Sequence, residues 1–399
     1  MSLNQVTSGE RPHIGFFGMR NAGKSSVVNA VTGQQLSVVS DVKGTTTDPV
    51  QKAMELLPLG PVVIIDTPGL DDEGELGALR MEKTRQILEK TDIAVLVVDA
   101  VKGMSAEDEA LKAQFEQRSI PYITVYNKAE LPGAAVPEAP ALSVSALTGK
   151  GIEALKERLG ALAPKAQNQK ALVSDLIEPG DLVVLVTPID ESAPKGRLIL
   201  PQQMTIRDIL DSHAMAVVTQ DTELPAALSS LGKKPKLVIT DSQAFGRVSK
   251  MVPEDITLTS FSILMARYKG DLKTLISGAN TLRHLKDGDK VLISEGCTHH
   301  RQCNDIGTVK MPGWIEKFCG AKPDFTFTSG NEFPADLSPF KLIVHCGACM
   351  LNEQAMKSRM GSAVAAEVPI VNYGIAIAHM NGILKRSVAL FPDIAALLN

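Results

Sequence analysis

The sequence predicts an α/β protein of three domains, the first of which is a doubly wound parallel sheet. Its 399 residues exceed the usual size of one hydrophobic core, and apolar segments of strand length alternate with helix-compatible segments. Residues 18–25 read GMRNAGKS, which matches G-x-x-x-x-G-K-[ST] between an apolar segment and a helical one. All five cysteines follow Ser294, so cysteine chemistry is predicted for the last domain.

The overall composition excludes some classes of function. Hydrophobic residues make up 44% of the chain and the net charge is −4, so no basic excess indicates a nucleic-acid partner. The polar residues 1–12 lack the apolar stretch of a signal peptide, and no later apolar run reaches transmembrane length. We therefore expect a cytoplasmic protein that binds neither nucleic acid nor a membrane. An odd number of cysteines favours metal or redox chemistry over a disulfide framework.

The first predicted domain, residues 1–165, carries polar residues where its apolar segments end. In a doubly wound sheet ligands bind at the carboxyl ends of the strands, so these residues are the first candidates for a site. The predicted strands are residues 14–17, 62–66, 93–99, 122–126 and 141–144.

The glycine-containing loop after the first of these strands predicts phosphate binding. Gly18 and Gly23 let the backbone turn so that successive N–H groups point inward, and the following helix adds its N-terminal partial positive charge. Lys24 supplies a charge for the β- and γ-phosphates, and Ser25 is placed to bind Mg²⁺. The loop therefore predicts a nucleotide site.

Four further motifs accompany the other predicted strands. Asp66 can reach Mg²⁺ through water, and the N–H group of Gly69, in the sequence DTPG, can contact a γ-phosphate. Residues 44–48 (GTTTD), 127–130 (NKAE) and 145–147 (SAL) complete the set. In this order the five motifs resemble those of the small GTPases, most closely the Era and tRNA-modification GTPase branch.

The resemblance implies roles for individual residues. Thr46 is implied to close on Mg²⁺, Asn127 and Lys128 to contact guanine, and Asn21 to support activation by K⁺. The implied catalytic residues are Lys24, Thr46, Asp66 and Gly69. The residues implied to bind GTP or GDP are Asn21, Ala22, Gly23, Lys24, Ser25, Ser26, Thr46, Asp66, Gly69, Asn127, Lys128, Glu130, Ser145 and Ala146, with Ser25 and Thr46 as Mg²⁺ ligands.

Two positions depart from the pattern of this GTPase branch. Glu130 stands where the family has an aspartate that accepts two N–H groups of the base, and its extra methylene predicts guanine discrimination weaker by about one or two powers of ten. Leu70 stands where related GTPases have a water-orienting glutamine, which predicts slow, switch-type hydrolysis of GTP to GDP and phosphate. GTP stays the expected nucleotide.

The second predicted domain, residues 166–265, follows a polar, proline-containing linker at residues 163–170. It again alternates helical and apolar segments, but it has neither a glycine fingerprint nor a cysteine. We expect it to serve as a dimerisation surface, because it lies between two domains that carry chemistry and shows none itself. Its predicted strands are residues 182–187, 216–219 and 236–240.

The third predicted domain, residues 266–399, places its cysteines at strand ends. The predicted strands at 291–294 and 342–344 run into the sequences EGCTHH and HCGAC. Further strands at 325–328 and 370–372 complete a small parallel sheet, in which both sequences leave the same carboxyl edge. The thiols predicted to converge there are those of Cys297, Cys346 and Cys349, with Glu295, His299 and His345 as candidates for a fourth metal ligand or for hydrogen bonds that tune the metal.

Three kinds of chemistry fit this cysteine pattern, because C-x-x-C serves zinc, iron–sulfur clusters and redox dithiols alike. Three thiolates and one imidazole would close a tetrahedral zinc site, whereas a redox dithiol would leave Cys297 without a function. Three thiolates also hold three corners of a cubane cluster and leave one iron open. Cys303 and Cys319 lie outside the pattern and are expected to be ordinary thiols.

The motifs C-x-H and HC-x-x-C, with 46 residues between His299 and Cys346, behind an Era-like GTPase, resemble the HydF family of [FeFe]-hydrogenase maturation GTPases over the whole chain. The resemblance implies a [4Fe-4S] cluster on the three cysteines and a homodimer or higher oligomer. It also implies a GTP-hydrolysing scaffold that assembles the di-iron subcluster of the hydrogenase. Its implied partners are two radical SAM maturases, which supply the precursor, and the apo-[FeFe]-hydrogenase, which receives it.

Two other functions stay open at this point. A regulatory or ribosome-assembly GTPase with a structural zinc site would carry a basic RNA-facing patch, and the net charge of −4 weighs against one. Alternatively, the GTPase domain only stabilises the chain, and the last domain is an electron-transfer module. Iron and sulfide analysis of protein handled without oxygen separates the zinc-containing GTPase from the scaffold.

Overall fold

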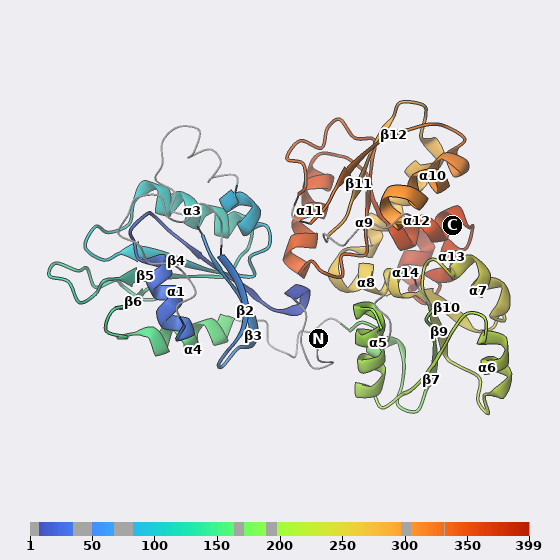
Figure 1. The fold of residues 1–399 in the computed structure, drawn as a ribbon, viewed down its shortest axis with the longest axis horizontal. Coiled ribbons are helices and arrows are strands. Elements are labelled where there is room, and N and C mark those ends of the chain that lie inside the picture. Colours follow the sequence, from blue (N-terminus) through green and yellow to red (C-terminus); the bar gives the residue numbers. More distant parts are fainter. Residues whose placement is uncertain are drawn as a thin grey trace. The chain divides into compact units, whose positions relative to one another are not determined.

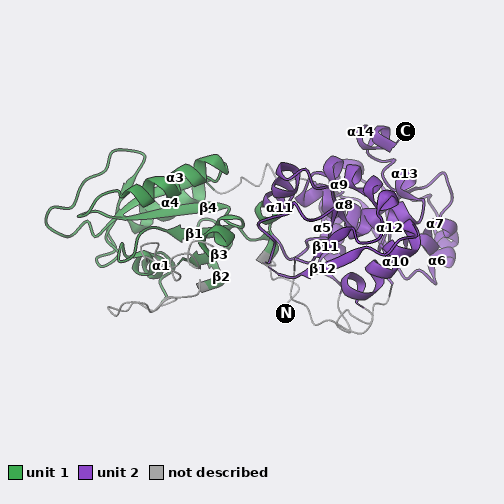
Figure 2. Ribbon diagram, turned by 90° about the horizontal axis from the view of Figure 1, so that it is seen from above, with its two compact units in different colours: residues 1–169, 352–355 green, residues 170–351, 356–399 purple. Residues whose placement is uncertain are grey.

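The computed structural model describes residues 8–34, 50–67, 83–162, 171–188, 198–296, 305–330 and 332–398. The chain forms two compact units, one of residues 1–169 with 352–355 and one of residues 170–351 with 356–399 (Figure 2). Among the described residues, none of the helices combines the length and the apolar character needed to cross a membrane.

Unit 1 is built on a six-stranded sheet in the order β2-β3-β1-β4-β5-β6, in which β2 is antiparallel and the other strands are parallel (Figure 1). Helices α1 and α4 pack against one face of this sheet, and α3 packs against the other. The elements are β1 (His13–Phe17), α1 (Lys24–Thr32), β2 (Val50–Leu56), β3 (Gly60–Asp66), β4 (Ile93–Asp99), α3 (Ala106–Gln117), β5 (Tyr122–Asn127), β6 (Leu142–Ser143) and α4 (Ile152–Leu162), after a short 3₁₀ helix at Ser8–Glu10.

The predicted α/β class and the doubly wound sheet are confirmed in this unit. The edge strand β2 was not among the predicted strands. Its sequence, VQKAMEL, mixes apolar and polar residues and is largely exposed, because an edge strand with one partner does not need a continuous apolar run. The central strand β4 is buried at every position, which explains its nearly continuous apolar sequence.

Unit 2 contains two four-stranded parallel sheets. The first, in the order β10-β9-β7-β8, includes β10, a four-residue strand (TLTS) that the sequence analysis did not predict. Its elements are η3 (Ser174–Leu176), β7 (Leu182–Val186), α5 (Leu200–Asp211), β8 (Met215–Thr219), α6 (Leu224–Ser230), β9 (Leu237–Thr240), α7 (Phe245–Met251), β10 (Thr257–Ser260) and α8 (Phe261–Lys269).

The second sheet of unit 2 has the order β12-β11-β13-β14 and contains all four strands that were predicted for the third domain. Ser294, the last residue of β11, lies opposite His345, the last residue of β13. Its elements are α9 (Leu272–Ala279), η4 (Asn280–His284), β11 (Lys290–Ser294), η5 (Ile306–Lys310), α10 (Met311–Cys319), β12 (Asp324–Thr328), β13 (Leu342–His345), α11 (Glu353–Ala365), β14 (Ile370–Asn372), α12 (Tyr373–Met380), α13 (Leu384–Ser387), α14 (Pro392–Ala395) and η6 (Ala396–Leu398).

Candidate functional site

The loop between β1 and α1 has a backbone that requires its two motif glycines. Gly18 has φ 137° and Gly23 has φ 88°, values that residues with a side chain rarely adopt. A Cβ atom at Gly18 would overlap the carbonyl oxygen of Val97, and one at Gly23 would overlap the side-chain nitrogen of Asn127. Asn21, between them, also has a positive φ, of 60°. The spacing of the motif is thus fixed by the turn that the backbone makes.

Lys24 and Ser25 follow this turn at the start of α1. Lys24 is only 7% exposed, and its ammonium donates to the carbonyl oxygens of Gly18 (3.0 Å) and Met19 (2.9 Å), so the side chain lies folded over the loop. The Ser25 hydroxyl donates to Oδ2 of Asp66 at the end of β3 (2.6 Å). Two residues predicted to act on Mg²⁺ therefore lie in contact.

Asn127 connects three of the predicted motifs. Its buried side chain donates from Nδ2 to the carbonyl oxygen of Ala22 in the phosphate loop (3.0 Å) and accepts at Oδ1 from the N–H group of Ala146 (3.1 Å). Ser145 is buried and accepts at Oγ from the N–H group of Thr148 (3.1 Å). The loop, the NKAE segment and the SAL segment are thereby held as one structure.

Lys128 forms an ion pair with Asp99, a residue that the sequence analysis did not single out. Its ammonium lies 2.6 Å from Oδ2 of Asp99, the last residue of β4. Burial alone raises the pKa of Asp99, but the hydrogen bonds from Lys128, Val101 and Lys102 outweigh it and hold the pKa below its ordinary value. A carboxylate at the end of an apolar strand was the signal that could have identified Asp99.

The remaining predicted nucleotide residues divide into two groups. Ser26 is partly exposed on α1, and Glu130 is exposed after β5. Thr46 and Gly69 lie outside the described residues, as does Leu70.

Cys346 lies where the two aligned strands β11 and β13 end. Its sulfur accepts hydrogen bonds from the N–H groups of Gly296 (3.0 Å) and Ala348 (3.4 Å). Gly296 belongs to the loop after β11, so both predicted cysteine loops contribute to this contact. N–H groups that point at a sulfur favour its thiolate form, which is the form that binds metals.

The other thiol of the C-x-x-C loop, Cys349, lies close to a buried cation. Lys269, the last residue of α8, is 2% exposed, and its ammonium donates to the carbonyl oxygens of Ala348 (3.3 Å), Cys349 (3.1 Å) and Leu351 (2.6 Å). Burial raises the pKa of the Cys349 thiol, while the charge of Lys269 and the N–H groups of Cys349 and Met350 oppose this rise. No sequence pattern pointed to Lys269.

His345 is fully buried, and both of its ring nitrogens are engaged. Nδ1 lies 2.9 Å from the carbonyl oxygen of Cys346, and Nε2 lies 2.9 Å from Nη1 of Arg359 on α11. Because arginine only donates, Nε2 is the acceptor and Nδ1 carries the proton. Burial, with a smaller effect of the Arg359 charge, lowers the pKa of His345 to about 3, so the ring is neutral. In this geometry His345 supports the cysteine loop from the core side.

Glu295 is buried beside Tyr373, the first residue of α12. The Tyr373 hydroxyl donates to Oε1 of Glu295 (3.3 Å), and a Cβ atom at Gly307 would overlap both groups. Burial and then the charge of Glu295 raise the pKa of Tyr373, so the phenol stays protonated and able to donate. Cys297 and His299 lie outside the described residues, and among the described residues no group of three histidine, cysteine or acidic side chains is arranged to hold a metal ion.

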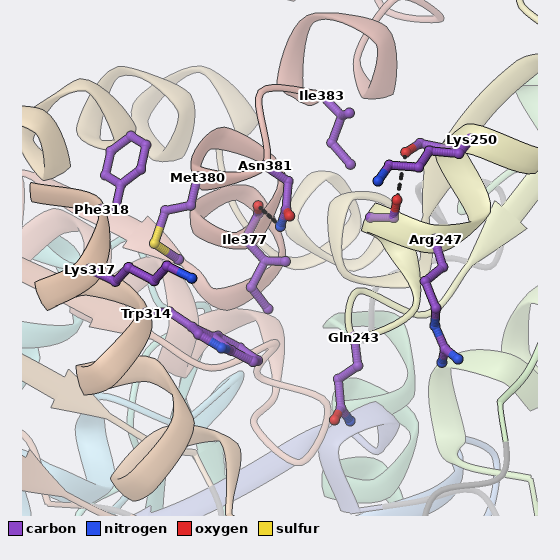
Figure 3. Close-up of a pocket in the computed structure, with 12 residues that line it drawn as sticks. Gln243, Arg247, Lys250, Trp314, Lys317, Phe318, Ile377, Met380, Asn381 and Ile383 are labelled. Carbon is purple, nitrogen blue, oxygen red and sulfur yellow. Dashed lines mark hydrogen bonds between the residues drawn. The ribbon is translucent and has the colours of Figure 1, made fainter.

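Unit 2 also contains a cavity of about 820 Å³ between α7, α10 and α12, which Figure 3 shows. Trp314 and Phe318 contribute aromatic rings, and Arg247, Lys250 and Lys317 contribute cationic side chains that are exposed to solvent. Arg247 is paired with Asp221 (2.5 Å). None of the predicted site residues lines this cavity.

The fold and the phosphate loop define the class of protein, which is a P-loop GTPase. Residues 13–128 match the family model described as 50S ribosome-binding GTPase. Residues 172–270 match the hydrogen maturase F dimerization domain, and residues 273–390 match the hydrogen maturase F tetramerization domain. The last two stretches together exceed half of the chain, and the chain belongs to the hydrogen maturase F family of hydrogenase maturation GTPases. The predicted family resemblance is confirmed.

The curated relatives compared below match less than half of the chain. The tRNA modification GTPase MnmE of Ralstonia nicotianae is 36% identical over 160 residues, which are 37% of this chain and 34% of that protein. The GTPase Der of Wolinella succinogenes is 35% identical over 163 residues, with the same coverage. The chain thus spans about a third of the length of the curated relatives it matches. Among solved structures, an Era variant of Aquifex aeolicus bound to GDP and AlF₄⁻ aligns with a TM-score of 0.35 and 20% identity, over 55% of this chain and 98% of that one.

Proposed function

We propose that this chain binds and hydrolyses GTP and acts as the scaffold on which the di-iron subcluster of [FeFe]-hydrogenase is assembled and then delivered to the apo-hydrogenase. The proposed platform is a [4Fe-4S] cluster held by Cys297, Cys346 and Cys349. One observation carries this proposal. The sulfur of Cys346 accepts hydrogen bonds from N–H groups of both cysteine loops, at the aligned ends of β11 and β13. The family membership supports the same function.

The donor set fits an iron–sulfur cluster. Cluster irons bind thiolates, and the N–H groups at Cys346 and the cation at Cys349 both stabilise negative charge on sulfur. Gly296, whose N–H group donates to Cys346, directly precedes Cys297 in the chain. Glu295 and His299 are the proposed source of a fourth ligand or of hydrogen bonds to the cluster. The ring nitrogens of His345 are already engaged by Cys346 and Arg359, so His345, the third sequence candidate, is proposed to hold the cysteine loop instead.

The proposed nucleotide site comprises the phosphate loop and the ends of β3 and β5, with Mg²⁺ and K⁺ as ions. The contacts of Asn127 with Ala22 and Ala146 support it, because they preform the loop that a nucleotide would enter. Its proposed residues are Asn21, Ala22, Gly23, Lys24, Ser25, Ser26, Thr46, Asp66, Gly69, Asn127, Lys128, Glu130, Ser145 and Ala146.

We further propose three domains that divide this work: the GTPase at residues 1–165, dimerisation at 166–265 and cluster binding at 266–399. Matches to a dimerization and a tetramerization domain support assembly into a homo-oligomer. The proposed external partners are radical SAM maturases and the apo-hydrogenase, in the cytoplasm.

Anaerobic reconstitution with iron and sulfide tests the scaffold function. We expect about four irons and four sulfides per chain, broad visible absorption, and an electron paramagnetic resonance signal after reduction. A colourless protein that binds one zinc tightly and excludes iron would instead establish a structural zinc site.

GTP is expected to control partner binding rather than metal chemistry. Coupling between two sites is typically about 1–3 kcal/mol, which changes an affinity about 5- to 150-fold but does not break Fe–S bonds. The affinity for the apo-hydrogenase is measured by titrating it with protein loaded either with GDP or with a non-hydrolysable GTP analogue. Equal affinities in the two states would contradict the proposed control.

Restoring the shorter side chain in Glu130→Asp is expected to sharpen guanine recognition. The ratio of the dissociation constants for ATP and GTP should rise about 10- to 100-fold, because the carboxylate then reaches both N–H groups of the base. Glu138→Asp, at another exposed position of the same unit, is the matched control and should leave the ratio unchanged. An unchanged ratio in Glu130→Asp would mean that residue 130 does not contact the base.

A further inference from the structure

Lys269 has no assigned role, yet it is among the most deeply buried charged side chains of unit 2. Burying an ammonium group is costly unless hydrogen bonds compensate it. A lysine in the last turn of a helix usually extends into solvent or binds the carbonyl groups of its own helix. Lys269 instead reaches a loop about 80 positions later in the sequence and donates to its carbonyl groups of Ala348, Cys349 and Leu351.

The peptide groups that Lys269 binds also face the Cys349 thiol. The carbonyl group of one residue and the N–H group of the next belong to one planar peptide unit and point in opposite directions. Because the carbonyl oxygens of Ala348 and Cys349 face the ammonium, the N–H groups of Cys349 and Met350 point the other way, and both interact with the sulfur of Cys349. One cation thus orients and polarises two peptide units toward one thiol.

We propose that Lys269 is a positioning residue for the metal centre: it holds the C-x-x-C loop with its N–H groups aimed at the Cys349 sulfur and offsets the negative charge of the bound thiolate cluster. The inference rests on the proposed function in that Cys349 is taken as a cluster ligand. Lys269 also lies in the stretch that matches the dimerization domain, whereas the loop lies in the stretch that matches the tetramerization domain. A charge from the stretch that matches the dimerization domain therefore lies beside the proposed cluster site in the stretch that matches the tetramerization domain.

The test is the reduction potential of the reconstituted cluster, measured by a redox titration followed by electron paramagnetic resonance. Lys269→Met removes the charge and keeps an unbranched side chain that is one atom shorter. We expect the reduced form to be disfavoured about tenfold, which is a potential lower by about 59 mV for a one-electron couple. Lys269→Arg keeps the charge and should stay close to the native potential.

Two further variants complete the design. Lys273→Met, at an exposed lysine in the first turn of α9, removes the same charge away from the loop and should leave the potential unchanged. Lys269→Gln removes the charge but keeps a hydrogen-bond donor for the carbonyl groups, so it provides a neutral variant that folds if Lys269→Met does not.

The outcomes separate this inference from the proposed function. A native protein that takes up no cluster contradicts the proposed function itself. A cluster in Lys269→Met or Lys269→Gln with the native potential overturns the role of Lys269 alone, even if less of the cluster is retained, because a purely structural residue would change cluster content and not potential.

Discussion

Replacing Cys346 with serine is expected to abolish stable cluster binding. The substitution removes the sulfur on which N–H groups from both cysteine loops converge and leaves a hydroxyl group, which binds iron poorly. Iron and sulfide content after anaerobic reconstitution should fall at least about tenfold relative to the native protein. The visible absorption and the resonance signal of the reduced cluster should fall with it.

Cys319→Ser is the matched control for this experiment. Cys319 ends α10, and its sulfur donates to the carbonyl oxygens of Glu316 (3.8 Å) and Ala321 (3.7 Å). Its replacement should leave the cluster intact. Both variants should bind a fluorescent GTP analogue like the native protein, which shows that unit 1 remains folded. A full complement of iron with an unchanged spectrum in Cys346→Ser would exclude Cys346 as a ligand.

The nucleotide loop was predictable because its determinants are local. Gly18 and Gly23 are required by the backbone angles of a single turn, and Lys24 and Ser25 follow from the first turn of the next helix. Parallel-sheet geometry also predicted that the strands before both cysteine loops end side by side, and the pairing of Ser294 with His345 confirms this. Local spacing and strand order were therefore sufficient for these features.

The surroundings of the cysteines were not predictable in the same way. Lys269 reaches the C-x-x-C loop through the packing of α8, and Arg359 fixes the ring of His345 from α11. Such contacts depend on how helices pack on a sheet, and no periodicity or motif in the chain encodes them. The sequence could identify His345 as a candidate metal ligand or hydrogen-bonding residue. The contacts with Arg359 and Cys346 show which atoms its two ring nitrogens engage.

Gly23→Ala is expected to abolish GTP binding. Gly23 has φ 88°, and a Cβ atom there would overlap Nδ2 of Asn127, which currently donates to the carbonyl oxygen of Ala22. The loop must then shift, and with it the N–H groups that would surround the phosphates. We expect affinity for a fluorescent GTP analogue to fall at least about 100-fold in an equilibrium titration.

The control Gly33→Ala separates the two possible causes of the lost affinity, which are the overlap with Asn127 and the strain of a positive φ angle. Gly33 directly follows α1 with φ 64°, but a Cβ atom there would meet no atom within 4 Å. Its substitution therefore adds only the backbone strain of a left-handed residue, about 1–2 kcal/mol of folding stability, and should leave GTP affinity near the native value. If Gly23→Ala binds the analogue as tightly as Gly33→Ala, the contact between Asn127 and Ala22 does not shape the nucleotide site. A loss of affinity confined to Gly23→Ala means that nucleotide binding depends on the space that the Asn127 side chain fills, so the NKAE segment and the phosphate loop act as one structure.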